Sequence, residues 1–352
     1  MSKVYRLGIV GLSGIAQSEP EIPPAPFDAG QTNGYGSHAT ALSRLENIEI
    51  VGACDLVPEL RDKFAKTWKS RWPNVCLYDD YTKMLKDGNL DIVTVATGDN
   101  VHTKLAIWAA ESRVKAVFCE KPLATSLDEA DQIIQSCKDN NVVLVVDHTR
   151  RWMPIFHQIR EAIRSGSIGK LTKIILTQGG ARAMLFRNGT HMIDLIGFFA
   201  ESEPVKVWAK LEEGFDDWDR YKGDGGKKPE NDPSATGFIQ FKNDIQALYF
   251  ADKNSYPGLS LQLYGNKGKI NTNGNTTTMT INEGGKNGVD RTQTIEAESC
   301  TIQGITAAYT ELISLIEHGG EGVSMGIEAR ITVQIMMGFL NSNHSGSVLI
   351  DV

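Results

Sequence analysis

Lys121 is the residue whose side chain and position in the sequence most clearly suit it to a catalytic role. It stands in Glu120-Lys121-Pro122, directly after the apolar run 114–119, which predicts a buried parallel strand. Open α/β sheets bind ligands outside the carboxyl ends of their strands, so we expect the Lys121 amine to face a ligand crevice. Beside a bound cationic ring and an apolar wall, an ammonium loses its proton more readily and can polarise or deprotonate a hydroxyl. A surface lysine in a strand-to-helix turn is the alternative interpretation.

A glycine-rich turn follows the first apolar run, residues 6–10. It reads Gly-Leu-Ser-Gly-Ile-Ala, an imperfect form of the dinucleotide-binding pattern G-x-G-x-x-G/A. Ser13 occupies the second glycine position, where glycine normally lets the backbone approach a pyrophosphate, so we expect the phosphates to lie slightly further out. Many glycine-rich turns bind nothing, and this motif alone is weak. The candidate cofactor-binding residues of the turn are Gly11, Ser13, Gly14, Ile15 and Ala16.

Asp55 strengthens the dinucleotide interpretation. It ends the second predicted strand, 48–54, where a carboxylate can accept both ribose hydroxyls and repel a 2′-phosphate, which favours NAD over NADP. The usual spacing from turn to acid is about 20 residues, and here it is roughly twice that. The excess is the insertion 17–36, which is too rich in proline and glycine to be helical. We expect the insertion, with Phe27 and Tyr35, to form a partial lid over the cofactor cleft; a surface loop is the alternative.

Strands and helices alternate through the first half of the chain. Near-continuous apolar runs end near residues 10, 54, 78, 96, 119 and 147, and helical segments are expected at 59–70, from His102 and from Ser126. Buried strands in alternation with helices predict an α/β fold with a doubly wound parallel sheet. We assign residues 1–148 to this Rossmann-type dinucleotide-binding domain.

The second half, residues 149–352, has a different pattern. Successive apolar runs at 171–176, 205–209, 237–241, 247–250 and 259–264 are joined by short turns, which predicts a C-terminal α+β domain with a large open antiparallel sheet. Helices at 304–318 and 326–340 are expected to cover that sheet. The Asp-, Gly- and Lys-rich segment 213–233 is expected to be a long exposed loop.

The composition excludes several classes of function. The chain has 352 residues, 41% of them hydrophobic and 22% charged, and a net charge of -7, which argues against a nucleic-acid or anionic-membrane partner. Apolar runs stay shorter than the ~20 residues that span a bilayer. The first strand begins too early to leave room for a signal peptide. Five scattered cysteines indicate reduced thiols and the cytoplasm, and the absence of a Cys/His cluster with ligand spacing predicts no metal.

The chain resembles the glucose-fructose oxidoreductase / inositol dehydrogenase / rhizopine catabolism (Gfo/Idh/MocA) family nearly from end to end. Glu-Lys-Pro after a buried strand, followed later by Gly-x-His-x-x-Asp, is the most specific combination. The motifs that carry the resemblance are 11–16, 53–55, 94–97 with His102, 119–124, 149–154, 166–169 and 188–194.

The resemblance implies roles for individual residues. Lys121 matches the lysine that contacts both the nicotinamide ribose and the substrate hydroxyl, and its bond to Pro122 is often cis in the family. Thr97 matches a residue that lines the nicotinamide side of the cleft. His191 matches the histidine taken as the proton acceptor, and Asp194 matches an acid near the same pocket. Glu120 and His102, within the matched motifs, complete the candidate cofactor-binding residues.

One departure from the family pattern concerns the proton relay. Many members carry an aspartate four residues before the histidine, and this chain has Arg187 there, followed by Asn188. An arginine is always charged and cannot act as a base, so the proton must be handled by Lys121 and His191, or through water. Arg187 would suit a carboxylate or phosphate on the substrate; the alternative is a solvent-facing or ion-paired side chain. Asn188 and Arg151 are further candidate substrate contacts.

The leading hypothesis is an NAD(P)-dependent oxidoreductase that transfers hydride between a sugar, cyclitol or sugar-acid hydroxyl and the nicotinamide. An NAD-retaining glycoside hydrolase and a catalytically silent NAD-binding sensor of the same family are the alternatives. The resemblance also implies a homodimer or homotetramer formed through the C-terminal sheet.

Overall fold

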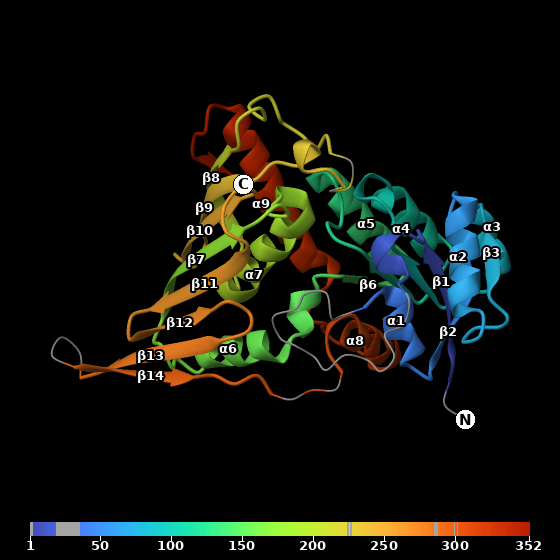
Figure 1. Cartoon of the computed structure of the whole chain (residues 1–352), viewed down its shortest axis with the longest axis horizontal. Helices are drawn as coiled ribbons and strands as arrows, with labels where there is room; N and C mark the ends of the chain where they lie inside the picture. Colours follow the sequence, from blue (N-terminus) through green and yellow to red (C-terminus); the bar gives the residue numbers. More distant parts are fainter. Residues whose placement is uncertain are drawn as a thin grey trace. The chain divides into compact units, whose positions relative to one another are not determined.

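The computed structural model describes residues 3–18, 36–223, 225, 227–284, 288–298, 300 and 302–352. These residues form two compact units (Figure 1). The first unit contains the described residues up to 152 together with 302–329, and the second contains those from 153 to 300 together with 330–352. Most of the insertion 17–36, with Phe27 and Tyr35, lies outside the described residues, so the expected lid stays a prediction.

A six-stranded parallel sheet forms the centre of the first unit. Its strand order is β3-β2-β1-β4-β5-β6, and every neighbouring pair is parallel. This is the doubly wound order of a Rossmann fold, as the sequence predicted. The strands are β1 Tyr5–Val10, β2 Ile48–Cys54, β3 Cys76–Tyr78, β4 Ile92–Val95, β5 Ala116–Cys119 and β6 Val143–Val146.

Helices lie on both faces of this sheet. α4 packs against α5, whereas α1 packs against α8, and the two pairs lie on opposite sides of the sheet (Figure 1). Side-chain caps fix where several helices begin: the side chains of Ser37, Asp80 and Ser126 accept hydrogen bonds from the first turns of α1, α3 and α5. The helices are α1 His38–Ser43, α2 Pro58–Trp68, α3 Tyr81–Asp87, α4 His102–Glu111, α5 Leu127–Asp139 and α8 Gly304–His318.

Helix α8 departs from the expected domain division. The sequence predicts its bounds, but its apolar side chains cover the first unit instead of the C-terminal sheet. Ile305, Tyr309 and Leu312 are buried in the same core as Leu7, Ile50 and residues of α1. Residues 302–329 therefore group with the first unit, whereas the sequence assigned them to a domain beginning at residue 149. Periodicity identifies an apolar helix face but does not say which core that face joins.

A nine-stranded sheet forms the second unit. Its order is β14-β13-β12-β11-β7-β10-β9-β8-β15. All neighbouring pairs are antiparallel except β7 and β10, so the sheet is mixed where a wholly antiparallel sheet was expected. The strands are β7 Leu171–Gly179, β8 Pro204–Leu211, β9 Ala235–Phe241, β10 Gln246–Asp252, β11 Gly258–Gly265, β12 Gly268–Thr272, β13 Thr277–Glu283, β14 Val289–Thr294 and β15 Ile350–Asp351.

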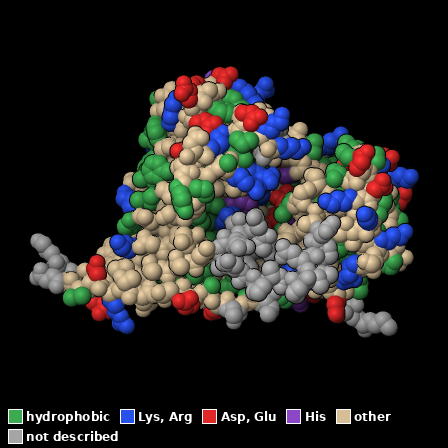
Figure 2. Space-filling model, viewed as in Figure 1, with side chains coloured by type: hydrophobic (Ala, Val, Ile, Leu, Met, Phe, Trp, Pro, Cys, Tyr) green, Lys and Arg blue, Asp and Glu red, His purple; other side chains and the backbone are tan. Residues whose placement is uncertain are grey.

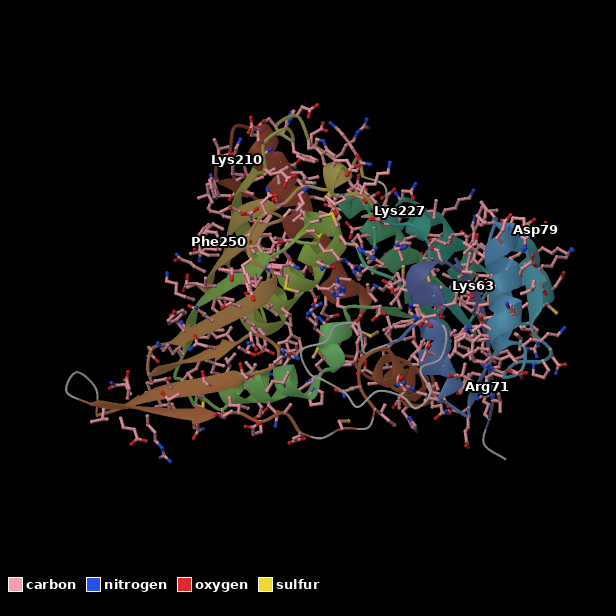
Figure 3. All side chains as sticks on the ribbon, in the orientation of Figure 1. Lys63, Arg71, Asp79, Lys210, Lys227 and Phe250 are labelled. Carbon is pink, nitrogen blue, oxygen red and sulfur yellow. The ribbon has the colours of Figure 1, made fainter. Side chains whose placement is uncertain are left out.

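Helices cover one face of the nine-stranded sheet. These are α6 Pro154–Arg164, α7 Thr190–Ala200 and α9 Gly326–His344. Phe339 of α9 lies directly over Gly237 of β9, and Phe156 of α6 packs edge-to-face on Phe199 of α7. The opposite face carries alternating exposed side chains, among them Phe250 of β10 and Lys210 of β8, which Figure 3 labels on the side away from α7. One face of the sheet is therefore core and the other is surface.

The segment 213–233 is less exposed than the sequence suggested. Phe215 and Trp218 are only 7% and 8% exposed, and their rings pack edge-to-face with centroids 4.8 Å apart. Asp232, near its end, is fully buried. Among the described residues, no helix combines the length and apolar character needed to span a bilayer.

Candidate active site

The carboxyl ends of the parallel strands meet at one edge of the six-stranded sheet. The register pairs Val10 with both Cys54 and Val95, and Val95 with Cys119. The residues that follow these strands, Gly11, Asp55, Thr97 and Lys121, therefore emerge at the same edge. The strand order reverses at β1 and β4: β2 and β3 follow on one side and β5 and β6 on the other. This switch point is the position where doubly wound sheets bind dinucleotides.

The turn after β1 requires its first glycine. Gly11 has φ +83°, and a Cβ there would lie 2.5 Å from the carbonyl oxygen of Ala96. No other residue fits that space in that conformation. Ser13, Gly14 and Ile15 are exposed, whereas Ala16 is buried and its N–H donates to the carbonyl of Ser13. The exposed part of the turn can therefore receive a phosphate, and the buried Ala16 anchors the turn.

Asp55 holds this turn in place. One carboxylate oxygen accepts the N–H of Leu12 at 2.7 Å, and the other accepts the N–H of Val57 at 2.9 Å. The guanidinium of Arg61 donates to the Asp55 carbonyl at 2.6 Å. A carboxylate has about four acceptor positions, so the half-buried Asp55 keeps lone pairs for ribose hydroxyls. The glycine turn and Asp55 thus fit a bound dinucleotide.

His102 is buried behind the site instead of open to a cofactor. Its Nδ1 lies 2.9 Å from the carbonyl oxygen of Pro122, and its Nε2 lies 3.2 Å from that of Thr97. The ring therefore ties the loop after β4 to the loop after β5, where the Lys121–Pro122 bond is cis as the resemblance implied. His102 thus has a structural role here, and a direct contact with the cofactor stays a prediction. Thr97 is half-buried, and its hydroxyl bonds to the Gly98 carbonyl.

Glu120 also faces inward. It is 6% exposed; Oε1 lies 3.1 Å from Nε2 of His38, and Oε2 accepts the N–H of Lys121 at 3.2 Å. Burial alone would raise the pKa of Glu120, but the hydrogen bond from His38 and the positive charge of Lys121 outweigh it and lower that pKa to about 2. Glu120 is therefore a buried carboxylate that holds the Lys121 backbone, which differs from the cofactor contact expected for it.

Three residues near Lys121 were missed by the sequence interpretation. His38, Tyr309 and Asp147 are buried, and donor atoms of His38, Glu120 and Asp147 lie within 4.8 Å of one another. Such a group can in principle hold a metal, which the sequence spacing did not suggest. The direct hydrogen bond between His38 and Glu120 already occupies the ring nitrogen, however. The position of Asp147 at the end of β6 was the available signal.

The segment before α7 presents the other candidate residues. Leu185–Gly189 forms a single π-helical turn, a feature frequent at functional sites. The buried carboxylate of Asp232 accepts the backbone N–H groups of Phe186 and Arg187 at 3.0 and 2.9 Å. Arg187, Asn188 and His191 are all half-buried, and His191 stands in the first turn of α7.

Two expected substrate contacts are internal. Asp194 is 1% exposed, and its Oδ1 accepts the hydroxyl of Thr332 at 3.3 Å, within the second unit. Arg151 is 5% exposed, and its guanidinium donates to the carbonyl of Val323 at 2.7 Å, within the first unit. Both side chains thus have partners within their own unit, and their role as substrate contacts stays a prediction.

The parallel sheet, the glycine turn and Asp55 together define a dinucleotide-binding α/β protein. A family model described as an oxidoreductase family with an NAD-binding Rossmann fold matches residues 5–148. A second model, the GFO/IDH/MocA C-terminal domain, matches residues 156–271. The chain belongs to the GFO/IDH/MocA oxidoreductase family.

Curated relatives match part of the chain. Myo-inositol 2-dehydrogenase of Thermotoga maritima is 32% identical over 127 residues, which are 36% of this chain and 38% of that enzyme. D-apiose dehydrogenase of Paraburkholderia graminis is 32% identical over 133 residues, 38% of this chain and 34% of that enzyme. The match thus spans well under half the length of either relative.

A solved structure extends the similarity to the whole fold. An oxidoreductase from Agrobacterium radiobacter, in complex with NAD+, L-tartaric acid and magnesium, superposes with a TM-score of 0.74. The alignment covers 99% of this chain and 98% of that one, at 16% identity. At such identity the likeness shows a shared fold.

Proposed function

We propose that the protein is an NAD(P)-dependent dehydrogenase or reductase that acts on a CH–OH group of a sugar, cyclitol or sugar acid. The observation that carries this proposal is Lys121, at the carboxyl end of β5, on the same sheet edge as the Gly11 turn and Asp55. A primary amine there is suited to act on a hydroxyl next to a bound dinucleotide. Inositol and apiose dehydrogenases among the relatives support the substrate class.

The protein would place and polarise the alcohol. A bound nicotinamide cofactor supplies the hydride acceptor. Lys121 would donate a hydrogen bond to the alcohol oxygen, and His191 would accept the hydroxyl proton in the oxidation direction. Imidazole is the side chain that most often takes up and releases a proton near neutral pH. Asp55 would select NAD, because its charge disfavours a 2′-phosphate.

The substrate would carry a negative charge. Arg187 occupies the place of the usual relay aspartate and belongs to a rigidly anchored turn. A second guanidinium is close: burial first, and then the charge of Arg187, lower the pKa of Arg182. Two neighbouring guanidinium groups suit a carboxylate or phosphate. The tartaric acid bound by the structural neighbour is consistent with a sugar acid.

The outer face of the nine-stranded sheet is the proposed contact between subunits. Leu248 and Phe250 of β10 are 37% and 38% exposed, and Tyr256 is 93% exposed. Figure 2 shows green apolar side chains along this side of the second unit. Adjacent exposed apolar groups on a sheet favour association. Light scattering of the wild-type protein and Phe250→Glu would test it, since the charged variant should dissociate. The buried thiols of Cys54, Cys119 and Cys137 agree with a cytoplasmic location, which we also propose.

The decisive assay follows NAD(H) absorbance over a panel of sugars, inositols and sugar acids at pH 7 and 9. With a substrate found, Lys121→Ala should abolish turnover while NAD binding stays measurable by calorimetry. Lys115→Ala is the matched control, because Lys115 stands before the same strand at its opposite end and pairs with Asp91. Near-normal turnover in Lys121→Ala, or an equal loss in Lys115→Ala, would contradict the role of Lys121.

A further inference from the structure

Four buried side chains form a hydrogen-bonded chain that ends at Lys121. The Thr94 hydroxyl lies 2.8 Å from the Tyr309 hydroxyl, which lies 2.9 Å from Nδ1 of His38. Nε2 of His38 lies 3.1 Å from Oε1 of Glu120, and Oε2 of Glu120 accepts the N–H of Lys121. These residues come from β4, α8, α1 and the end of β5, so the chain joins distant parts of the sequence.

The interior fixes this arrangement. Thr94, Tyr309 and His38 are each 0% exposed, and Glu120 is 6% exposed. Phe118 packs edge-to-face on both rings, with centroids 4.6 Å from Tyr309 and 5.4 Å from His38. A buried polar group that loses its hydrogen-bond partner keeps its full desolvation penalty. Each of these four side chains is therefore held in place by the hydrogen bonds to its neighbours.

The carboxylate sets the direction of the hydrogen bonds. An ionised Glu120 only accepts, so Nε2 of His38 carries the proton that points to it. In the neutral ring, Nδ1 then accepts from the Tyr309 hydroxyl, and Thr94 donates to Tyr309. Burial raises the pKa of Tyr309 well above its usual value, so it stays a phenol. The tautomer is assigned from the network.

Other ionisable groups surround this chain. Asp147, at the end of β6, places Oδ2 3.9 Å from the same Nε2 of His38. The charges of Lys121 and His102 act on Glu120, and Cys119 precedes it on β5. Asp147 is the weaker acceptor of the two carboxylates, because its distance exceeds that of a hydrogen bond.

We propose that His38 is a positioning residue for Lys121. By donating from Nε2 to Glu120, it fixes the carboxylate whose other oxygen holds the backbone N–H of Lys121. His38 thus acts through Glu120 and does not touch substrate or cofactor. The inference rests on the proposed function, because it assumes that Lys121 acts on the substrate.

Two substitutions at His38 test the roles of its two ring nitrogens separately. In His38→Gln the side-chain amide can replace Nε2 and still donate to Glu120, whereas in His38→Asn the shorter amide replaces Nδ1 and loses that contact. We expect kcat to fall about tenfold or more in His38→Asn, with little change in KM, as for other residues that orient a functional group. His38→Gln should stay within about threefold of the wild type, and both variants should bind NAD normally.

The split between kcat and KM distinguishes positioning from packing. If His38 acts on Lys121 through Glu120, kcat should fall in His38→Asn and recover in His38→Gln, because only the glutamine amide restores the donor that Glu120 has lost. Tyr309→Phe is the control, because it removes the neighbour on Nδ1 and leaves the contact with Glu120. Equal losses in all three variants, tracking their melting temperatures, would overturn the proposal.

A second measurement requires neither a folded His38 variant nor turnover. With 15N-labelled histidine, NMR of the wild-type protein should show a proton on Nε2 of His38, assigned by the shift that Tyr309→Phe causes. A proton on Nδ1 alone would overturn the proposal, and so would a stoichiometric metal in the purified wild-type protein whose removal shifts the His38 resonances. Failure of the substrate panel would affect only the proposed function, because the tautomer is read without substrate.

Discussion

Replacing Asp147 with asparagine should remove a large pH dependence from the stability of the first unit. Asp147 is 1% exposed; Oδ1 accepts the Thr149 hydroxyl at 3.0 Å, and its N–H donates to the carbonyl of Cys119. Burial, and next the negative charge of Glu120, raise the pKa of Asp147 from its usual 3.8 to about 7. The folded protein therefore holds a proton there that the unfolded chain releases.

The sign and size follow from proton linkage. A carboxyl whose pKa is raised on folding contributes stability below its unfolded pKa and loses it as the pH rises through the folded pKa. Each pH unit in this interval corresponds to about 1.4 kcal/mol. Between pH 5 and 7 the stability of the wild-type protein should therefore fall by about 2 kcal/mol, whereas Asp147→Asn, which cannot ionise, should not show this fall. The difference between the unfolding free energies of the variant and the wild type should therefore rise by this amount from pH 5 to pH 7.

Urea unfolding at pH 5, 6, 7 and 8, at constant ionic strength, measures this difference. Tryptophan fluorescence reports on the first unit through Trp68, Trp72, Trp108 and Trp152, and on the second through Trp208 and Trp218. Asp62→Asn, at an exposed position on α2, is the control and should show a difference that is nearly constant with pH. A flat difference for Asp147→Asn would mean that Asp147 is ionised in the folded protein, and the account of the buried cluster would then be wrong.

Further predictions concern cofactor and substrate. Gly11→Ala should weaken NAD binding, measured by calorimetry, about tenfold or more. The alanine Cβ would meet the Ala96 carbonyl, and φ at this position is positive. Unchanged affinity would refute the steric argument. Asp55→Asn should raise the ratio of kcat/KM with NADP to that with NAD, since the charge opposing the 2′-phosphate is gone; an unchanged ratio would count against the assignment. Arg187→Met should raise KM about tenfold for an acidic substrate and little for a neutral polyol, and equal effects on both would exclude an anion contact.

Local patterns sufficed for most of the fold. Strands β1 to β6 are short and almost wholly apolar, so they are recognisable without knowledge of their neighbours. Caps such as Ser37 and Ser126 act within one helical turn and mark helix starts reliably. The sequence did not predict strands β12 to β14, because their residues are largely polar. Their extended conformation depends on pairing with the neighbouring strands.

The amino-acid sequence alone determined the doubly wound sheet, the glycine turn, Asp55 at the end of β2 and Lys121 at the end of β5. These features depend on residues adjacent in the chain. Only the tertiary structure decided that α8 joins the first unit and that His38, Tyr309 and Asp147 meet Glu120. It also decided that His102, Arg151 and Asp194 turn inward. The direction of a polar side chain depends on partners brought close by packing, and no local spacing encodes those partners.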